Sequence, residues 1–376
     1  GTLVNATTTT TDVTLNLISD DKPSVSSIAP DKTTIAENGG ASIITATISA
    51  AHSKEVTIPL TITGTATNDK DYSTAFSTKG DVSTVAGGNG TGISTKHINH
   101  PRALYVDSSG SLYVIDWAEH RVLKWTPGAS EGTVVAGGNG KGSANNQFFT
   151  ANGIYVDKSG NIFITDGNNH RVMKWTPNAL EGTVVAGGND KGSELNQLNY
   201  PTGIYLDASG NIYVADSYNH RIVKWEPGAT SGTVVAGGNG EGSGLNQLPT
   251  PYGIDMDSSG NLYIAEIGND RVMKWVPGSP DGTVVATGNV NTQYRDPMDV
   301  TIDNSGNLYV ADSYNHRIVK WTPGASEGIV VAGGNGNGSA DNQLFAPDGI
   351  HVDGSGNIYI ADKENHRIQL VQFAPE

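Results

Sequence analysis

The sequence predicts an all-β protein, most of which forms a six-bladed β-propeller. A unit of about 50 residues recurs six times and carries the motifs Asp-x-Ser-Gly-Asn, Asp-x-x-Asn-His-Arg and Lys-Trp, with some variation between copies. Every copy contains short apolar stretches separated by turn residues, and none shows helical periodicity. Short strands at even spacing are typical of propeller blades. The copies begin at Asp107, Asp157, Asp207, Asp257, Asp303 and Asp353.

The second copy shows how one blade is predicted. Its Ser159-Gly160-Asn161 segment is a tight turn that requires a positive φ, and it separates the first two apolar stretches. A second turn is expected over 166–170. The expected strands are 153–157, 162–165, 172–175 and 183–186.

The two ends of the repeat region are expected to close the ring. The sixth copy ends after its third strand, over 367–373, and lacks a fourth. A matching strand, over 83–88, precedes the first copy. If these segments pair, no long strand edge stays open in the ring. The propeller is therefore expected over 80–376.

The tripeptide after the second strand carries a family resemblance. It reads Asn169-His170-Arg171, Asn219-His220-Arg221, Asn315-His316-Arg317 and Asn365-His366-Arg367. These copies resemble the NHL-repeat family over about 80–376, and two copies depart from it, with Glu119-His120-Arg121 and Asn269-Asp270-Arg271. The resemblance implies a propeller, but its members include sensor domains, lyases and RNA- or protein-binding modules. It therefore implies the fold more closely than the function.

Residues present in every copy are interpreted as scaffold. In Asp-x-x-Asn-His-Arg, the Asp is expected to cap turn amides and pair with the Arg, and the Asn to adopt the left-handed conformation. The Gly-rich loop Ala-Gly-Gly-Asn-Gly-x-Gly is followed by no helix, which argues against phosphate binding.

A column of tryptophans has two interpretations. Large aromatic side chains are expected to pack between blades. Alternatively, with the nearby Glu131, Glu181, Asp281 and Glu327, they could stack on sugars in repeated lectin-like sites. The column contains Trp125, Trp175, Trp225, Trp275 and Trp321.

Function is expected where the copies differ, above all at the rim of the central channel. The innermost strands should place Arg102, Asn152, Thr202, Tyr252, Met298 and Asp348 there, with Asp299 where most copies have Gly. The candidate binding residues are Arg102, Asn152, Tyr252, Asp299 and Asp348. Among them, Asn152, Asp299 and Asp348 could hold a hard cation such as calcium. A second candidate locus is the connection over 288–294, four residues shorter than its equivalents because Asp257 and Asp303 are 46 rather than 50 residues apart.

The N-terminal part follows a different pattern. Alternating β-branched and polar residues predict an incomplete Ig-like β-sandwich over 23–79. The segments 35–40 and 64–72 resemble a Calx-β domain, and the resemblance implies calcium binding by Glu37 and Asp71. Residues 1–22 are expected to form an extended strand or linker, with Val13, Leu15 and Leu17 on one side. This strand could fold back locally, or insert into a neighbouring molecule and build a fibre.

Composition excludes several classes of function. The net charge of −15 and the low content of charged residues, 16%, disfavour nucleic-acid binding. No apolar run is long enough to span a membrane, and the absence of cysteine excludes disulfides. We expect an extracellular or cell-surface adhesion protein that uses its propeller as a display or interaction module. Its partners would be other protein subunits, including itself, or surface glycans. The sequence indicates no definite cofactor, and calcium is the candidate. The alternatives are a glycan-binding lectin and a channel-centred, metal-dependent lyase or lactonase.

Overall fold

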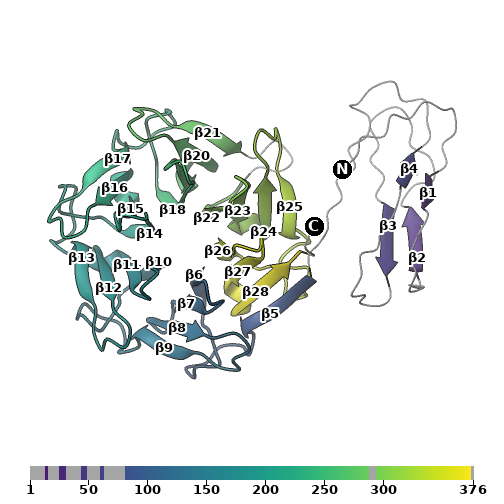
Figure 1. The fold of residues 1–376 in the computed structure, drawn as a ribbon, viewed down its shortest axis with the longest axis horizontal. Helices are drawn as coiled ribbons and strands as arrows, with labels where there is room; N and C mark the ends of the chain where they lie inside the picture. The colour runs from purple at the N-terminus through teal and green to yellow at the C-terminus, as the bar shows by residue number, and fades with distance from the viewer. Residues whose placement is uncertain are drawn as a thin grey trace. The chain divides into compact units, whose positions relative to one another are not determined.

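The C-terminal part of the chain is a ring of six blades. The computed structural model describes residues 13–15, 25–30, 44–48, 60–62, 81–287 and 294–373. The chain divides into two compact units, Gly1–Phe76 and Ser77–Glu376. The described strands of the second unit form six antiparallel sheets of four strands each, arranged around a centre (Figure 1). The predicted all-β, six-bladed propeller is confirmed.

Within each blade, the strands follow one another from the centre of the ring to its edge. Blade 1 contains β6 (Pro101–Val106), β7 (Leu112–Asp116), β8 (Arg121–Trp125) and β9 (Thr133–Gly137). Blade 2 contains β10 (Ala151–Val156), β11 (Ile162–Asp166), β12 (Arg171–Trp175) and β13 (Thr183–Gly187). Blade 3 contains β14 (Pro201–Leu206), β15 (Ile212–Asp216), β16 (Arg221–Trp225) and β17 (Thr233–Gly237).

The second half of the ring repeats this order. Blade 4 contains β18 (Pro251–Met256), β19 (Leu262–Glu266), β20 (Arg271–Trp275) and β21 (Thr283–Thr287). Blade 5 contains β22 (Pro297–Ile302), β23 (Leu308–Asp312), β24 (Arg317–Trp321) and β25 (Ile329–Gly333). Blade 6 contains β26 (Pro347–Val352), β27 (Ile358–Asp362), β28 (Arg367–Gln372) and β5 (Asp81–Gly87).

The last blade joins the two ends of the ring. β5 is the outer strand of blade 6 and pairs antiparallel with β28, from Arg367 opposite Gly87 to Gln372 opposite Asp81. In Figure 1, β5 lies beside β28 although about 280 residues separate them in sequence. β5 is thus the strand that the sequence predicted, over 83–88, to pair with the last blade and close the ring.

The ring has two faces, which antiparallel pairing defines. We call the end at which the inner strands begin the mouth face; the turns between second and third strands lie there too. The opposite end, the far face, carries the turns between first and second strands and between third and fourth strands. In five blades, a single 3₁₀ turn connects the second and third strands: η1 (Gly167–Asn169), η2 (Ser217–Asn219), η3 (Ile267–Asn269), η4 (Ser313–Asn315) and η5 (Lys363–Asn365). No helix among the described residues could cross a membrane.

Apolar side chains fill the space between neighbouring blades. Ile115 and Val122 of blade 1, for example, pack in one cluster with Ile164 and Met173 of blade 2. Five further clusters do the same at the other seams. Burial of this surface at about 25 cal/mol per Å² stabilises the ring mainly through contacts between blades.

The inner strands β6, β10, β14, β18, β22 and β26 lie side by side around the centre. Their third residue is usually glycine because the neighbouring strand comes very close. A Cβ on Gly153 would collide with the carbonyl oxygen of Thr202, and one on Gly203 with that of Tyr252. Neighbouring inner strands therefore approach each other closely at this level.

The N-terminal unit is described only by four strands. β2 (Val25–Pro30) pairs antiparallel with β3 (Ile44–Ile48), and β1 (Val13–Leu15) pairs antiparallel with β4 (Leu60–Ile62). Thus Val13 and Leu15 lie in a strand that pairs within its own chain. The Calx-β-like sandwich stays a prediction, and Leu17, Glu37 and Asp71 lie outside the described residues.

Candidate functional site

The repeated Asp-Arg pair ties each blade to the loop that precedes it. In blade 2, Asp166 Oδ2 lies 3.0 Å from Arg171 Nε, and its Oδ1 accepts the N–H groups of Phe149 and Thr150. Arg171 also donates to carbonyl oxygens of the loop between blades 1 and 2. Equivalent carboxylate–Arg pairs, at 2.6 to 2.8 Å, occur in the other blades. These buried pairs have the scaffold role that the sequence predicted.

The motif histidine links consecutive blades. Its Nδ1 accepts the N–H of the residue just before the next inner strand, as His170 does from Tyr200 and His220 from Thr250, both at 3.2 Å. His316 and His366 make the same contact. The histidine also occupies the left-handed region, with φ near 55°, which corrects the expectation that the neighbouring Asn would do so. Asn169 instead donates to Asp166 and to the carbonyl of Gly142.

Blade 4 departs from the motif without losing its contacts. Asp270 stands where most copies have His, and its Oδ1 accepts the N–H of Asp296 at 3.1 Å. Glu266 replaces the usual Asp and keeps the Arg271 contact at 2.7 Å. The loop amide that an Asp would accept is missing at this seam, because residue 249 is a proline. Both departures are therefore structural adjustments.

The tryptophan column packs between the blades. Trp125, Trp175, Trp225 and Trp275 are only 1–4% exposed. Their ring faces are covered by neighbouring blades, so the hypothesis that these four stack on sugars is wrong. Trp321 is different: it is half-buried, and its Nε1 donates to the hydroxyl of the buried Tyr294. Tyr294 closes the shortened connection, of which residues 288–293 lie outside the described part of the chain.

At the mouth face, Arg102 reaches across the ring. Its guanidinium donates to the hydroxyl of Tyr252, which belongs to the opposite blade. The same group lies over the rings of Trp117 and Tyr252, at 5.7 and 5.6 Å from their centroids. Sequence comparison placed Arg102 and Tyr252 at the rim but missed Trp117, whose position reads Gly, Ser, Ile, Ser and Lys in the other copies.

A buried carboxylate completes this cluster. Asp348 Oδ2 lies 3.9 Å from Arg102 Nε and 3.7 Å from Lys363 Nζ. Burial raises the pKa of Asp348, and the two cations oppose that rise. Asn152 is also buried at the rim, where its Nδ2 donates to the carbonyl of Pro201 and its Oδ1 has no protein partner. We refer to Arg102, Trp117, Tyr252, Asp348 and Lys363 as the mouth cluster.

Exposed aromatic side chains lie around the mouth cluster on the same face. Trp117, Tyr218 and Tyr314 are 37%, 54% and 55% exposed, and Phe149 is similar to Trp117. Tyr218 stacks on Tyr200, with 4.9 Å between centroids. Cations cover two of the rings: Arg295 lies 3.9 Å from the centroid of Tyr314 and Lys141 lies 4.0 Å from that of Phe149. Trp117 occurs in blade 1 alone, whereas Tyr218 and Tyr314 occupy equivalent positions in blades 3 and 5.

Deeper in the ring, the fifth residues of the inner strands form a second level. They are Tyr105, Tyr155, Tyr205, Asp255, Thr301 and His351. Tyr105 contacts the rings of Tyr155 and His351, with centroids 5.0 and 4.9 Å apart, and Tyr155 contacts Tyr205. Burial raises the pKa of Tyr205 to about 12 and lowers that of His351 to about 4. This level was not predicted from the sequence.

Asp255 and Asp299 connect neighbouring inner strands. Asp299 Oδ2 accepts the N–H of Ile350 at 3.0 Å, and Asp255 Oδ2 accepts the N–H of Ile302 and the hydroxyl of Thr301. Burial raises the pKa of Asp299 to about 8 and that of Asp255 to about 6. Asp299 therefore binds the neighbouring backbone inside the ring, whereas the sequence placed it among the candidate ligands at the rim.

The rim residues expected to hold calcium already take part in other contacts. Asp299 is occupied by backbone N–H groups, Asp348 lies beside two cations, and Arg102 extends across the same mouth. Within 81–287 and 294–373, no three acidic or histidine side chains are placed to hold a metal ion. Calcium binding by Asn152, Asp299 and Asp348 stays a prediction, and two of these three side chains already have hydrogen-bond partners in the protein.

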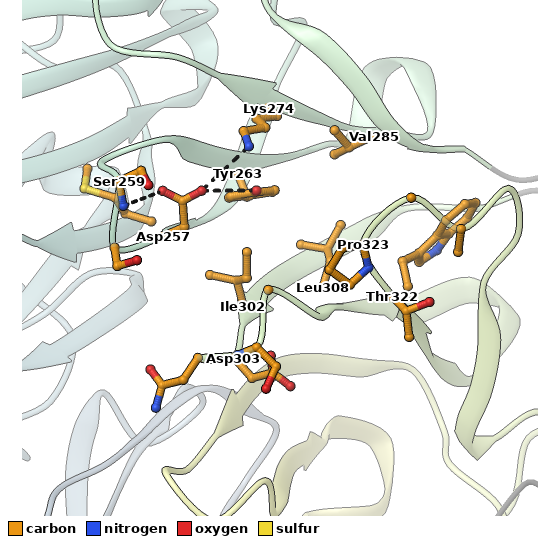
Figure 2. A pocket seen from close by; sticks show the side chains of 18 residues that line it. Asp257, Ser259, Tyr263, Lys274, Val285, Ile302, Asp303, Leu308, Thr322 and Pro323 are labelled. Carbon is orange, nitrogen blue, oxygen red and sulfur yellow. Dashed lines mark hydrogen bonds and ion pairs between the residues drawn. The ribbon is translucent and has the colours of Figure 1, made fainter. Parts of the chain in front are cut away.

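A cleft opens on the far face between blades 4 and 5. It has a volume of about 600 Å³ and is lined by the turns that start at Asp257 and Asp303, by Lys274 and by Trp321. Figure 2 shows Asp257, Tyr263 and Lys274 facing Ile302, Leu308 and Pro323. This is the seam at which the shortened connection occurs.

Comparison with known families identifies the repeats. Residues 150–175, 198–225, 294–321 and 346–369 match the NHL repeat. These are blades 2, 3, 5 and 6, so the unmatched blades are the two whose tripeptide departs from the motif. The chain is a six-bladed propeller that carries NHL repeats. No curated protein matches it.

Solved structures share this fold at low sequence identity. A protein of unknown function from Bacteroides thetaiotaomicron is 17% identical, with a TM-score of 0.61 over 96% of this chain and 91% of that chain. An auxiliary nutrient binding protein from the same organism is 15% identical, with a TM-score of 0.58 over 78% and 76%. A gluconolactonase from Xanthomonas campestris is 11% identical, with a TM-score of 0.56 over 75% and 88%. At such identities the likeness shows the fold alone.

Proposed function

We propose that the propeller is a protein-interaction module that binds a polypeptide partner on its mouth face. The observation that carries this proposal is the set of exposed aromatic side chains around the mouth cluster. Tyr, Trp and Arg are enriched where binding energy concentrates in protein interfaces. Trp117, Tyr218 and Tyr314 with Arg295 provide this composition on one face.

The scaffold supports such a role because it holds the variable connections rigidly. Asp166 and Arg171 bind the loop before blade 2 from both sides, and His170 binds the one after it. The backbone of these connections is therefore held in place before a partner arrives, which lowers the entropy lost on binding.

We place this activity outside the cell or at its surface, where the propeller would act in adhesion or display. The strongly negative charge and the polar, lysine-poor composition are compatible with that environment. Fibre formation would require the β1–β4 pair to form between chains instead of within one. Because β1 has a partner in its own chain, we do not include polymerisation in the proposal.

The lactonase or lyase alternative would use the same mouth. The Xanthomonas enzyme shares the fold, and nothing further follows from its 11% identity. Here the charged groups of the mouth engage one another, with Asp348 beside Arg102 and Lys363, and Arg102 on Tyr252. Such mutual pairing suits a contact surface better than a reaction centre.

Peptide selection tests the proposal. The full-length chain is used to select binders from a random peptide library, and each binder is measured against Trp117→Ala, Tyr314→Ala and Leu180→Ala. Leu180 is 90% exposed on the far face and serves as the matched control. We expect the first two substitutions to weaken binding roughly tenfold, as at interface hot spots. Binders that are indifferent to both would refute a mouth-face interface.

A further inference from the structure

The cleft between blades 4 and 5 is lined by half-buried residues of both blades. Its inner wall includes Met256 and Ile302, which are half-buried like the equivalent Val352, whereas Val106, Val156 and Leu206 are buried. Its outer wall includes Trp321, the one half-buried member of the tryptophan column. Part of Trp321 is therefore left uncovered on the far face of this seam.

The shortened connection offers a physical reason for the half-buried Trp321. Tyr294 occupies the seam where other copies place Phe148, Leu198 or Leu248, and it is fully buried. Its hydroxyl accepts the indole N–H of Trp321. The corresponding N–H groups of Trp125 and Trp175 have no side-chain partner, so this contact distinguishes blade 5.

The lining combines one apolar wall with a rim of neutral polar groups. Met256, Ile302, Trp321 and Pro323 provide the apolar surface. Hydroxyl and amide groups surround it, from Ser258, Ser259, Asn304, Ser305 and Thr322. A volume of about 600 Å³ lies within the range of small-molecule sites.

The charged groups of the cleft are already bound within the protein. Asp257 Oδ1 accepts the N–H groups of Ser259 and Asn261, and its Oδ2 lies 3.7 Å from Lys274 Nζ (Figure 2). Asp303 is bound in the same way by its own turn. An anionic ligand would face two carboxylates, and a cationic one would have to compete with Lys274 and with the turn N–H groups that already bind them. A neutral ligand with an apolar face and many hydroxyl groups meets neither penalty.

We propose that this cleft binds a neutral carbohydrate ring, with Trp321 along its apolar face and Asn304 and Ser305 on its hydroxyl groups. The site lies on the far face and is independent of the mouth-face interface. The proposal keeps the sugar-binding hypothesis for Trp321, which is the member of the tryptophan column that the blades leave partly uncovered.

The full-length chain is titrated with neutral methyl hexopyranosides and their oligosaccharides, and binding is read by saturation-transfer NMR and calorimetry. We expect at least one to bind, and Trp321→Ala to weaken it roughly tenfold or more. Because that variant can also loosen the seam, Asn304→Ala and Ser305→Ala, on an exposed turn, are measured as well and should weaken binding at least about twofold. Lys158→Ala, at the position of Asn304 in blade 2, and Trp117→Ala should leave binding unchanged.

Two results would overturn the assignment. One is that no sugar of the panel binds at concentrations up to about 10 mM, far weaker than ordinary small-molecule sites. The other is that a sugar binds with equal affinity to the parent chain and to the combined Asn304→Ala and Ser305→Ala variant.

Discussion

Asp270 accepts the backbone N–H of Asp296 across the seam between blades 4 and 5. At most other seams a histidine makes the equivalent contact. The two acceptors differ in how they respond to acid. A histidine must be neutral at Nδ1 to accept, whereas an aspartate loses its charge only at much lower pH. Burial lowers the pKa of His170 and of His366, so these two histidines stay neutral, and able to accept, to a lower pH than a free imidazole.

We expect the ring to lose stability as pH falls below about 6.5, the ordinary histidine pKa. Burial lowers the pKa of His170 and of His366, so the unfolded chain takes up protons before the folded one. His170→Asp copies the Asp270 arrangement and should lose less stability between pH 7 and pH 5 than the parent chain. We expect the difference to be a few tenths of a kcal/mol, because the imidazole of His170 is only partly buried. Urea unfolding at both pH values measures this. Equal losses in the two proteins would contradict the role given to His170.

Asp299→Gly tests the buried carboxyl group of blade 5. Its pKa rises to about 8 in the folded chain, so ionisation favours the unfolded state and stability falls between about pH 4 and pH 8. The variant lacks this loss, so its stability should increase relative to that of the parent chain as pH rises. The increase is on the order of 1 kcal/mol per pH unit at most. Asp190→Gly is the control, because Asp190 is exposed, has φ 63° and corresponds to Gly140 and Gly240. A pH-independent difference for Asp299→Gly would argue against the raised pKa.

Arg102→Met should destabilise the ring because it leaves the buried Asp348 with Lys363 as its remaining cation. Breaking a buried ion pair on one side costs about 3 kcal/mol. Adding Asp348→Asn removes the uncompensated charge and should restore much of that loss. Chemical denaturation of the two single variants and the double variant gives the coupling energy. Additive losses would show that the two side chains do not interact.

Removal of residues 1–76 should leave the propeller folded, because the chain divides there into two compact units. Removal of residues 1–88 also deletes β5, which exposes the edge of β28 and opens the ring. We expect only the chain that lacks residues 1–88 to melt at a lower temperature and to self-associate through the exposed edge of β28. A synthetic peptide spanning 79–90 should reverse both effects. Equal stability of the two truncated chains would mean that β5 does not hold the ring closed.

The sequence allowed the blades to be predicted because each turn has its own local chemistry. Asp157 accepts the N–H groups of Ser159 and Asn161, and this contact repeats in the other copies. The left-handed residue was assigned wrongly because asparagine adopts that conformation most readily among non-glycine residues. His170 adopts it instead because its side chain is bound by the next blade, a contact between segments about 30 residues apart.

The candidate sites were predicted less completely, for a geometric reason. Repeat comparison placed Arg102 and Tyr252 at equivalent positions, but their contact depends on the two residues lying on opposite sides of a ring. Trp117 and the level that contains Tyr105 and Asp255 lie at positions that vary between copies. Variation alone does not show which of those positions face the centre.

The pairing of β5 with β28 determines how the ring would respond to tension between its two ends. Asp81 lies opposite Gln372, so the chain enters and leaves this pair at the same end of the ladder. A pulling force would then break the hydrogen bonds one after another, as a zip opens, rather than load all of them together in shear. We therefore expect β5 to separate from β28, and the ring to open, at a lower pulling force than if the two strands were loaded in shear.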